Sequence, residues 1–164
     1  MIARRYRSIY SRRALIAGIA LAGLSTQARA DLQTFEKSKL VIETSKGKFP
    51  FTIELAMTEA QMEQGLMYRR ELAPDAGMLF DYRSPETITM WMKNTFIPLD
   101  MVFIGVDGKV VDFRERAVPF SLETIASKVP ARAVLEVNSG TVQRLGLQVG
   151  DVVHHPFFNN AITN

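Results

Sequence analysis

Apolar positions after residue 38 fall into short segments that are typical of strands. Phe49, Phe51, Ile53 and Leu55 alternate with polar or small residues, which is the pattern of a half-buried strand. The remaining predicted strands are short apolar runs bounded by turn residues: 40–44, 77–82, 87–92, 99–106, 109–115, 131–137 and 152–155. This pattern predicts an α+β domain that is β-rich, with a barrel-like or sandwich-like antiparallel sheet and one or two short helices.

Helix and turn signals lie between these runs. Thr58 and Gln61 have the spacing of a capping box, and Gly65 is placed to end the short helix that they begin. A second brief helix is predicted over 141–145. Asp107-Gly108 predicts a tight hairpin with a type I′ turn.

The first thirty residues have the pattern of a secretory signal. Arginines are followed by an apolar run over 14–24 and by an Ala-Arg-Ala cleavage site at 28–30. The run is too short to span a bilayer, which takes about 20 residues. Arg12-Arg13 also resembles a twin-arginine signal, and the sequence leaves the export route open.

This segment predicts a periplasmic or secreted protein with no stable membrane insertion after cleavage. The predicted parts are a signal peptide over 1–30, a flexible segment over 31–38, one domain over 39–156 and a tail over 157–164.

Charge and cysteine content exclude several classes of function. The whole chain has a net charge of +3, but six of its 20 basic residues precede residue 31 and all 17 acidic residues follow residue 30. The exported part therefore has 14 basic and 17 acidic residues, a net charge of −3, and no nucleic-acid partner is expected. Because the chain contains no cysteine, thiol nucleophiles and cysteine-based zinc sites are excluded.

The stretch over 90–101 concentrates polar residues between two apolar runs. Basic side chains there could hold an anionic group, Asn and Thr could bind hydroxyls, and Trp91 could stack on a ring. Such a site would suit a sugar, a polyol or a small carboxylate. The candidate ligand-binding residues are Arg69, Trp91, Lys93, Asn94, Thr95, Asp100 and Glu136.

A structural interpretation of the same residues stays open. Asn94 and Thr95 could satisfy the backbone of a bend, and Asp100 could pair with Lys93 or Arg69. For Trp91 alone, a place in the core is favoured, because large aromatic side chains are mostly buried.

Catalytic and metal sites have weaker support. His154 and His155 are adjacent on a predicted strand and would point to opposite faces, so with Asp151 they make a poor metal site. No cofactor or metal is expected. Asp100 with Glu136 or Asp151 could form an acid–base pair, and burial could raise the pKa of Glu136. An ion pair of Glu136 with an arginine (Arg69, Arg70 or Arg132) is favoured over that role, and an enzyme is the less expected outcome.

Five motifs in the same order resemble the DUF192 family, a domain family without an established function. They are Gln64-Gly65-Leu66-Met67-Tyr68-Arg69, Gly77-Met78-Leu79-Phe80, Trp91-Met92-Lys93-Asn94-Thr95 with Ile97-Pro98-Leu99-Asp100, Val134-Leu135-Glu136 leading to Gly140, and 147–151. The resemblance covers about residues 40–155. It implies a compact β-rich domain that is often exported, and it implies no reaction, cofactor or catalytic residue.

Together these observations predict a non-catalytic module that binds a small ligand in a polar pocket. An envelope hydrolase or lyase with paired carboxylates is one alternative. A protein-interaction or folding-factor domain with exposed Met and Phe side chains is another.

Overall fold

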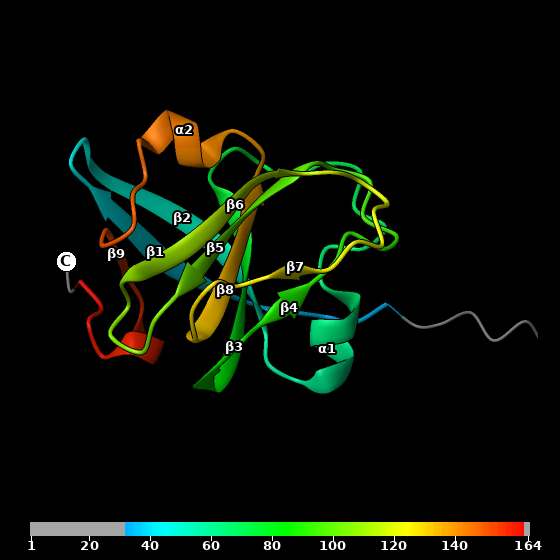
Figure 1. Ribbon diagram of the computed structural model, residues 1–164, viewed down its shortest axis with the longest axis horizontal. Coiled ribbons are helices and arrows are strands. Elements are labelled where there is room, and N and C mark those ends of the chain that lie inside the picture. The colour runs from blue at the N-terminus through cyan, green and yellow to red at the C-terminus, as the bar shows by residue number, and fades with distance from the viewer. Residues whose placement is uncertain (1–31, 163–164) are drawn as a thin grey trace, which may run out of the picture. The chain divides into compact units, whose positions relative to one another are not determined.

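A computed structural model describes residues 32–162 (Figure 1). The predicted signal segment lies outside the described residues. The elements are β1 (Glu36–Thr44), β2 (Gly47–Ala56), α1 (Glu59–Gln64), β3 (Ala76–Glu86), β4 (Thr89–Met90), β5 (Leu99–Ile104), β6 (Val110–Ala117), β7 (Ile125–Ala126), β8 (Ala131–Asn138), α2 (Thr141–Leu145), β9 (Val152–His154) and the 3₁₀ turn η1 (Pro156–Phe158). No helix among the described residues is long and apolar enough to cross a membrane.

One curled sheet dominates the domain. Its strand order is β6-β5-β8-β3-β2-β1-β9, and β4 pairs with β7 in a separate small ribbon. An antiparallel bridge between Lys109 and Val152 brings the two ends of the large sheet together, so the sheet forms a half-barrel (Figure 1). The predicted fold class, a β-rich α+β domain with one or two short helices, is confirmed, but the sheet is mixed rather than antiparallel because β2 and β3 pair in parallel.

The central strands β3, β5 and β8 are buried on both faces. Because successive side chains of a strand point to opposite faces, Val102 and Leu135 join one apolar cluster, while Met101 and Val134 join another. The first cluster contains residues from both ends of the curled sheet. The second lies under α1, β4 and the loops around them. This double burial explains why these strands are continuous apolar runs.

The helix α1 belongs to the crossover between β2 and β3, which pair in parallel. The predicted capping box is present: Thr58 Oγ1 accepts a hydrogen bond from Gln61 N at 3.2 Å, and the Gln61 side chain accepts one from Thr58 N. Gly65 ends the helix with a φ of 48°, and a Cβ there would lie 3.1 Å from the Phe80 ring. The turn after α1 therefore lies directly against β3.

Several predicted boundaries were wrong. Only residues 89–90 of the strand predicted over 87–92 pair, because their partner β7 is equally short. The hairpin turn is not type I′, since only Gly108 has a positive φ and Asp107 instead accepts a hydrogen bond from Lys109 N. β1 begins at Glu36, inside the segment predicted to be flexible, and Phe158 of the predicted tail is buried in the core.

Candidate functional site

Asp100 on β5 is completely buried and is bonded to the backbone. Its Oδ1 accepts a hydrogen bond from Arg116 N at 2.8 Å, and its Oδ2 accepts one from Val142 N at 2.9 Å. Val142 lies in the first turn of α2, whose N-cap residue Gly140 has no side chain to cap it. Asp100 therefore caps this helix from a neighbouring strand, and the predicted pairing with Lys93 or Arg69 was wrong.

Glu136 on β8 is 4% exposed and has a different environment. It lies opposite Met101 of β5, so its side chain is on the sheet face opposite to that of Asp100. Burial raises the pKa of Glu136 to about 8, and no hydrogen bond or charge within the described residues contributes to that shift. An unpaired buried carboxyl group resists ionisation because a low dielectric disfavours its charged form.

The arginines predicted to pair with Glu136 have other partners. Arg69 forms two hydrogen bonds with the Glu54 carboxylate, at 3.2 and 2.6 Å. Arg132 binds Asp81 in the same two-pronged way, at 3.1 and 3.2 Å. Arg70 lies over the ring of Phe96. The expected ion pair of Glu136 with an arginine was wrong.

The Glu136 side chain borders a narrow cleft, which we call the Glu136 cleft. Its walls come from α1 and the turn after it, from β3, and from the segment after β4. They are Met62, Glu63, Gln64, Gly65, Leu66, Met67, Phe80, Met90, Trp91, Thr95 and Glu136. The cleft has a cavity volume of about 30 Å³, which gives it room for a small group.

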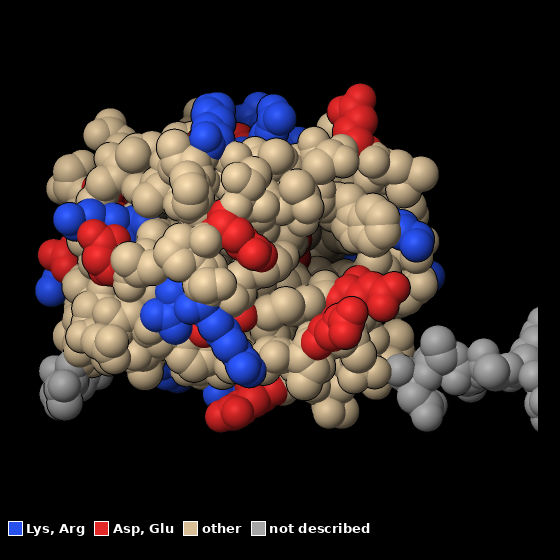
Figure 2. All heavy atoms as spheres, turned by 60° about the horizontal axis from the view of Figure 1, so that its bottom comes forward, with Lys and Arg blue, Asp and Glu red and all other residues tan. Residues whose placement is uncertain are grey.

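The electrostatic character of the Glu136 cleft is acidic. Glu63 and Glu136 are its charged lining residues. Burial and the carboxylates of Glu136 and Glu86 raise the pKa of Tyr82, so the charge of Glu136 also acts on the Tyr82 hydroxyl. Figure 2 shows a hollow on the face that carries α1, with acidic side chains beside it. A cation would reduce the cost of ionising Glu136 there, whereas an anion would raise it.

Trp91 forms part of the cleft rim and does not belong to the core, which corrects the favoured prediction. Its side chain is 45% exposed, and Lys93 Nζ lies 4.9 Å from the centroid of its ring. The apolar neighbour Met92 is fully buried and anchors the segment, so Trp91 points outward.

Asn94 and Thr95 form the bend that the structural interpretation predicted. Asn94 has a φ of 54°, and its Nδ2 donates to the hydroxyl of Tyr68 at 3.1 Å. Thr95 Oγ1 donates to the carbonyl of Lys93 at 3.2 Å, and Thr95 N donates to the carbonyl of Met92. Thr95 is buried but also lines the Glu136 cleft.

Of the predicted site residues, the cleft brings together Trp91, Thr95 and Glu136. Arg69, Lys93, Asn94 and Asp100 do not line it. Sequence reasoning missed the three methionines in the walls, Met62, Met67 and Met90, and also Glu63. The high methionine content was the available signal, although most of the other methionines are core residues.

The two histidines have separate partners. His154 Nε2 lies 2.7 Å from Glu43 Oε2, and its Nδ1 lies 2.9 Å from the carbonyl of Asn160. The His155 ring is buried and contacts Ser38 Oγ through Nε2 at 3.0 Å, while its Nδ1 accepts from Phe157 N. Burial lowers the pKa of His155. Both rings thus tie the C-terminal segment to β1.

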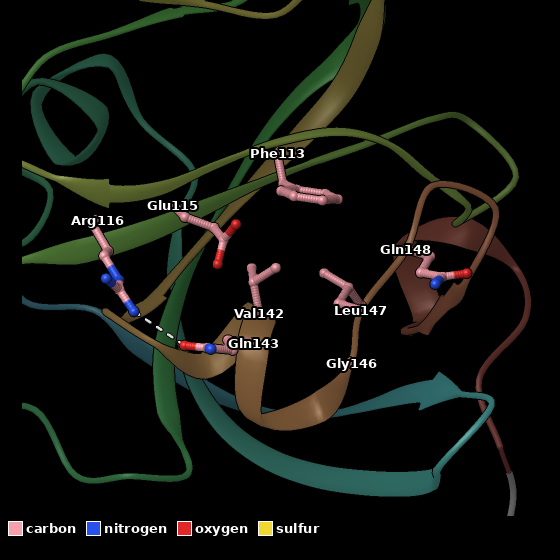
Figure 3. A pocket seen from close by; sticks show the side chains of 8 residues that line it. All are labelled: Phe113, Glu115, Arg116, Val142, Gln143, Gly146, Leu147 and Gln148. Carbon is pink, nitrogen blue, oxygen red and sulfur yellow. Dashed lines mark hydrogen bonds between the residues drawn. The ribbon is translucent and has the colours of Figure 1, made fainter.

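A larger groove of about 490 Å³ lies between β6 and α2 (Figure 3). Phe113, Val142 and Leu147 form its apolar wall, and the Glu115 carboxylate points into it. Arg116 donates a hydrogen bond to Gln143 Oε1 at 3.0 Å. The charged side chains of this groove, Glu115 and Arg116, are exposed to solvent and need no ligand to compensate for burial. The Glu136 cleft is therefore the stronger candidate.

Solved structures define the class of this fold. One is a proposed transcription regulator from Sinorhizobium meliloti 1021, with 45% identity and a TM-score of 0.74 over 77% of this chain and 99% of that one. Another is a protein of unknown function from Novosphingobium aromaticivorans DSM 12444, with 36% identity and a TM-score of 0.71 over 81% and 99% of the two chains. Both share the β-rich architecture described above.

The family model of DUF192, described as "Uncharacterized ACR", matches residues 41–155. The chain therefore belongs to the DUF192 family, as its five motifs predicted. Among curated proteins, none matches the sequence.

Proposed function

We propose that this domain is a non-catalytic binding module whose Glu136 cleft receives one small cationic group of a ligand, with Glu136 as its counter-charge and Trp91 as a side wall. The observation behind this proposal is the buried Glu136 carboxyl, which has no internal partner and borders the cleft. Buried carboxylates are normally paired, so an external cation would complete the arrangement.

The acidic lining changes the expected ligand. Arg69 and Lys93 were expected to hold an anionic or hydroxyl-rich molecule, but neither lines the cleft. A compact ammonium fits the small volume and the sign of the charge, and the indole of Trp91 is the strongest aromatic partner for a cation. Methionine walls can adjust to the attached carbon atoms, because their side chains are unbranched and polarizable.

Two other functions receive less support. Acid–base catalysis by Asp100 with Glu136 is disfavoured, because the two carboxyls lie on opposite faces of the sheet and Asp100 already accepts two backbone hydrogen bonds. The description of the S. meliloti relative suggests a nucleic-acid partner for that protein. In this chain the net charge of −3 after residue 30 argues against such a partner.

Calorimetric titration with n-butylamine, methylammonium, acetate and glucose tests the proposal. We expect the two cations to bind the wild type and the Glu136→Gln variant to lose that binding. As the pH is raised toward about 8, the affinity for the cations should rise by up to tenfold per pH unit, because binding requires Glu136 to release its proton. The Glu136 carboxyl affects the pKa of Tyr82, and Glu63 lines the same cleft, so the Gln variant is needed to assign the effect.

Glu115→Gln in the groove of Figure 3 is the matched control, because it also removes one carboxylate that faces a surface hollow. It should bind both cations as the wild type does. Binding of acetate or glucose without the cations, or equal cation binding by the Glu136→Gln variant, would contradict the proposal.

A further inference from the structure

An exposed aromatic surface borders the Glu136 cleft. We call it the aromatic patch, and it consists of Tyr68, Trp91, Phe96, Val118, Phe120 and Leu122. Five of these side chains are large apolar groups between 45% and 70% exposed, and Phe96 is half-buried between them. The Phe96 ring centroid lies 6.2 Å from that of Tyr68 and 5.3 Å from that of Phe120. Contiguous apolar surface of this kind marks interaction sites.

Backbone strain coincides with the patch. Tyr68, Asn94 and Phe120 have φ values of 66°, 54° and 61°, a region that side chains with a Cβ adopt at a cost. Glycine would adopt the same backbone freely, and asparagine with less strain than an aromatic residue. At positions 68 and 120 a strained backbone therefore exposes an aromatic ring, and such outliers cluster at binding sites.

Hydrogen bonds join the three loops into one surface. Tyr68 N donates to the carbonyl of Asn94 at 2.9 Å, and Phe120 N donates to the carbonyl of Thr95 at 3.2 Å. Met92 N donates to the carbonyl of Ser121 at 3.1 Å. The same bonds connect the patch to the cleft, because Thr95, Met67 and Trp91 line that cleft. The loops that carry the patch therefore also supply part of the cleft lining.

We infer that the partner of this surface is a polypeptide segment in which one lysine, flanked by apolar residues, places its ammonium in the Glu136 cleft while the flanking side chains pack on the aromatic patch. This inference rests on the proposed cation site and names its ligand class. Charge complementarity supplies the lysine, since Glu63 and Glu136 line the cleft. A lysine ammonium is compact, whereas the planar guanidinium of arginine needs more room.

The patch also explains why a polypeptide suits the site better than a free amine. A small amine in the cleft would leave the exposed side chains of Phe120 and Leu122 uncovered. A chain with apolar residues on both sides of a lysine covers both parts at once, and burial of that apolar area adds to its affinity.

Fluorescence anisotropy with labelled pentapeptides tests the inference on the purified protein. The probes are Gly-X-Lys-Z-Gly, in which X and Z are each Leu, Val or Phe, with matched peptides that carry Ser at X and Z and others that carry norleucine for Lys. We expect some apolar-flanked lysine peptides to bind at least tenfold more tightly than both matched sets. Equal binding of the Ser-flanked set would overturn the inference and leave the cation site intact.

The variant Phe120→Asn separates binding from folding. Asn accepts the left-handed backbone more easily than Phe, which offsets the lost contact with the Phe96 ring, so the melting temperature should change little. Affinity for the apolar-flanked peptides should fall about tenfold, while n-butylamine should bind as it does to the wild type. Unchanged peptide binding by Phe120→Asn would refute the role of the patch. If the wild type does not bind n-butylamine at all, the proposed function is refuted as well.

Vesicles of phosphatidylethanolamine and phosphatidylcholine provide the last comparison, because their head groups also contain an ammonium. The wild type should not co-sediment with them. Vesicle binding that Phe120→Asn abolishes would overturn the peptide assignment in favour of a membrane surface.

Discussion

Asp100 and Glu136 are two buried carboxyl groups on neighbouring strands, and they differ in what surrounds them. Residue 100 of β5 pairs with Val137, and residue 136 of β8 pairs with Met101, so the two side chains leave the sheet on opposite faces. Asp100 has two backbone donors at 2.8 and 2.9 Å, whereas Glu136 borders an open cleft without an internal partner. The same chemical group is bonded to the backbone in one place and has no hydrogen-bond partner among the described residues in the other.

Helix α2 explains why the fold needs Asp100. The helix has only five residues, begins after Gly140, and lacks a side-chain cap of its own. Free amides at a helix start require an acceptor, and a negative charge there also interacts favourably with the helix dipole. Asp100 meets both needs from β5, and its bond to Arg116 N fixes the end of β6 at the same time.

The largest expected effect is the loss of stability in Asp100→Ala. The substitution leaves the buried amide of Val142 and the partly buried amide of Arg116 without acceptors, which should lower the free energy of unfolding by about 3–5 kcal/mol. Urea denaturation measures the change. Asp100→Asn keeps one acceptor oxygen and should lose about half as much, and a loss below about 1 kcal/mol in the Ala variant would contradict the capping role.

The sequence predicted Asp100 as a candidate site residue, but it could not identify the partners of its carboxylate. They are backbone amides at residues 116 and 142, and a backbone group leaves no trace in the identity of its residue. The strands and the capping box of α1 were predictable, because the spacing of apolar residues and the residues of a helix cap lie close together in the sequence. Pairing of β2 with β3 in parallel, and the register of β5 on β8, depend on contacts between distant segments.

The exposure of Trp91 also could not be predicted from the sequence. Its size favoured the core, but Met92 takes the inward position, and one residue along an extended segment reverses the direction of a side chain. For Glu136 the sequence did suggest a raised pKa, because Val134, Leu135 and Val137 surround it. Whether an arginine would neutralise it depended on the places of Arg69 and Arg132, which bind Glu54 and Asp81 instead.

The second effect is a dependence of stability on pH that arises from the raised pKa of Glu136. Folded Glu136 keeps its proton up to about pH 8, whereas the unfolded chain loses it near the ordinary pKa of about 4.3. Between these values the folded state binds more protons, so stability falls as the pH rises. The unfolding free energy of the wild type minus that of Glu136→Gln should fall by about 1.4 kcal/mol per pH unit from about pH 5 to pH 8.

Urea denaturation at several pH values measures this difference, in which most contributions from other titrating groups cancel. Glu115→Gln is again the control, because it also replaces one glutamate by glutamine, at an exposed position outside the cleft. A flat difference for Glu136→Gln would mean that the carboxyl is ionised in the folded protein, and would remove the contrast with Asp100.

The smallest effect concerns Lys93, a charged residue whose partner is exposed. Its ammonium lies 4.9 Å from the Trp91 ring centroid, and because both side chains are exposed the contact should contribute about 0.5–1 kcal/mol at most. Lys93→Met keeps an unbranched side chain that is one atom shorter and removes its charge, so the unfolding free energy should change by no more than that amount. The same variant should bind n-butylamine up to about threefold more tightly, since it frees the indole face from an internal cation.

A loss of several kcal/mol in the unfolding free energy of Lys93→Met would show that Lys93 stabilises the fold as Asp100 does. Weaker amine binding would show that its ammonium takes part in the site rather than competing for Trp91.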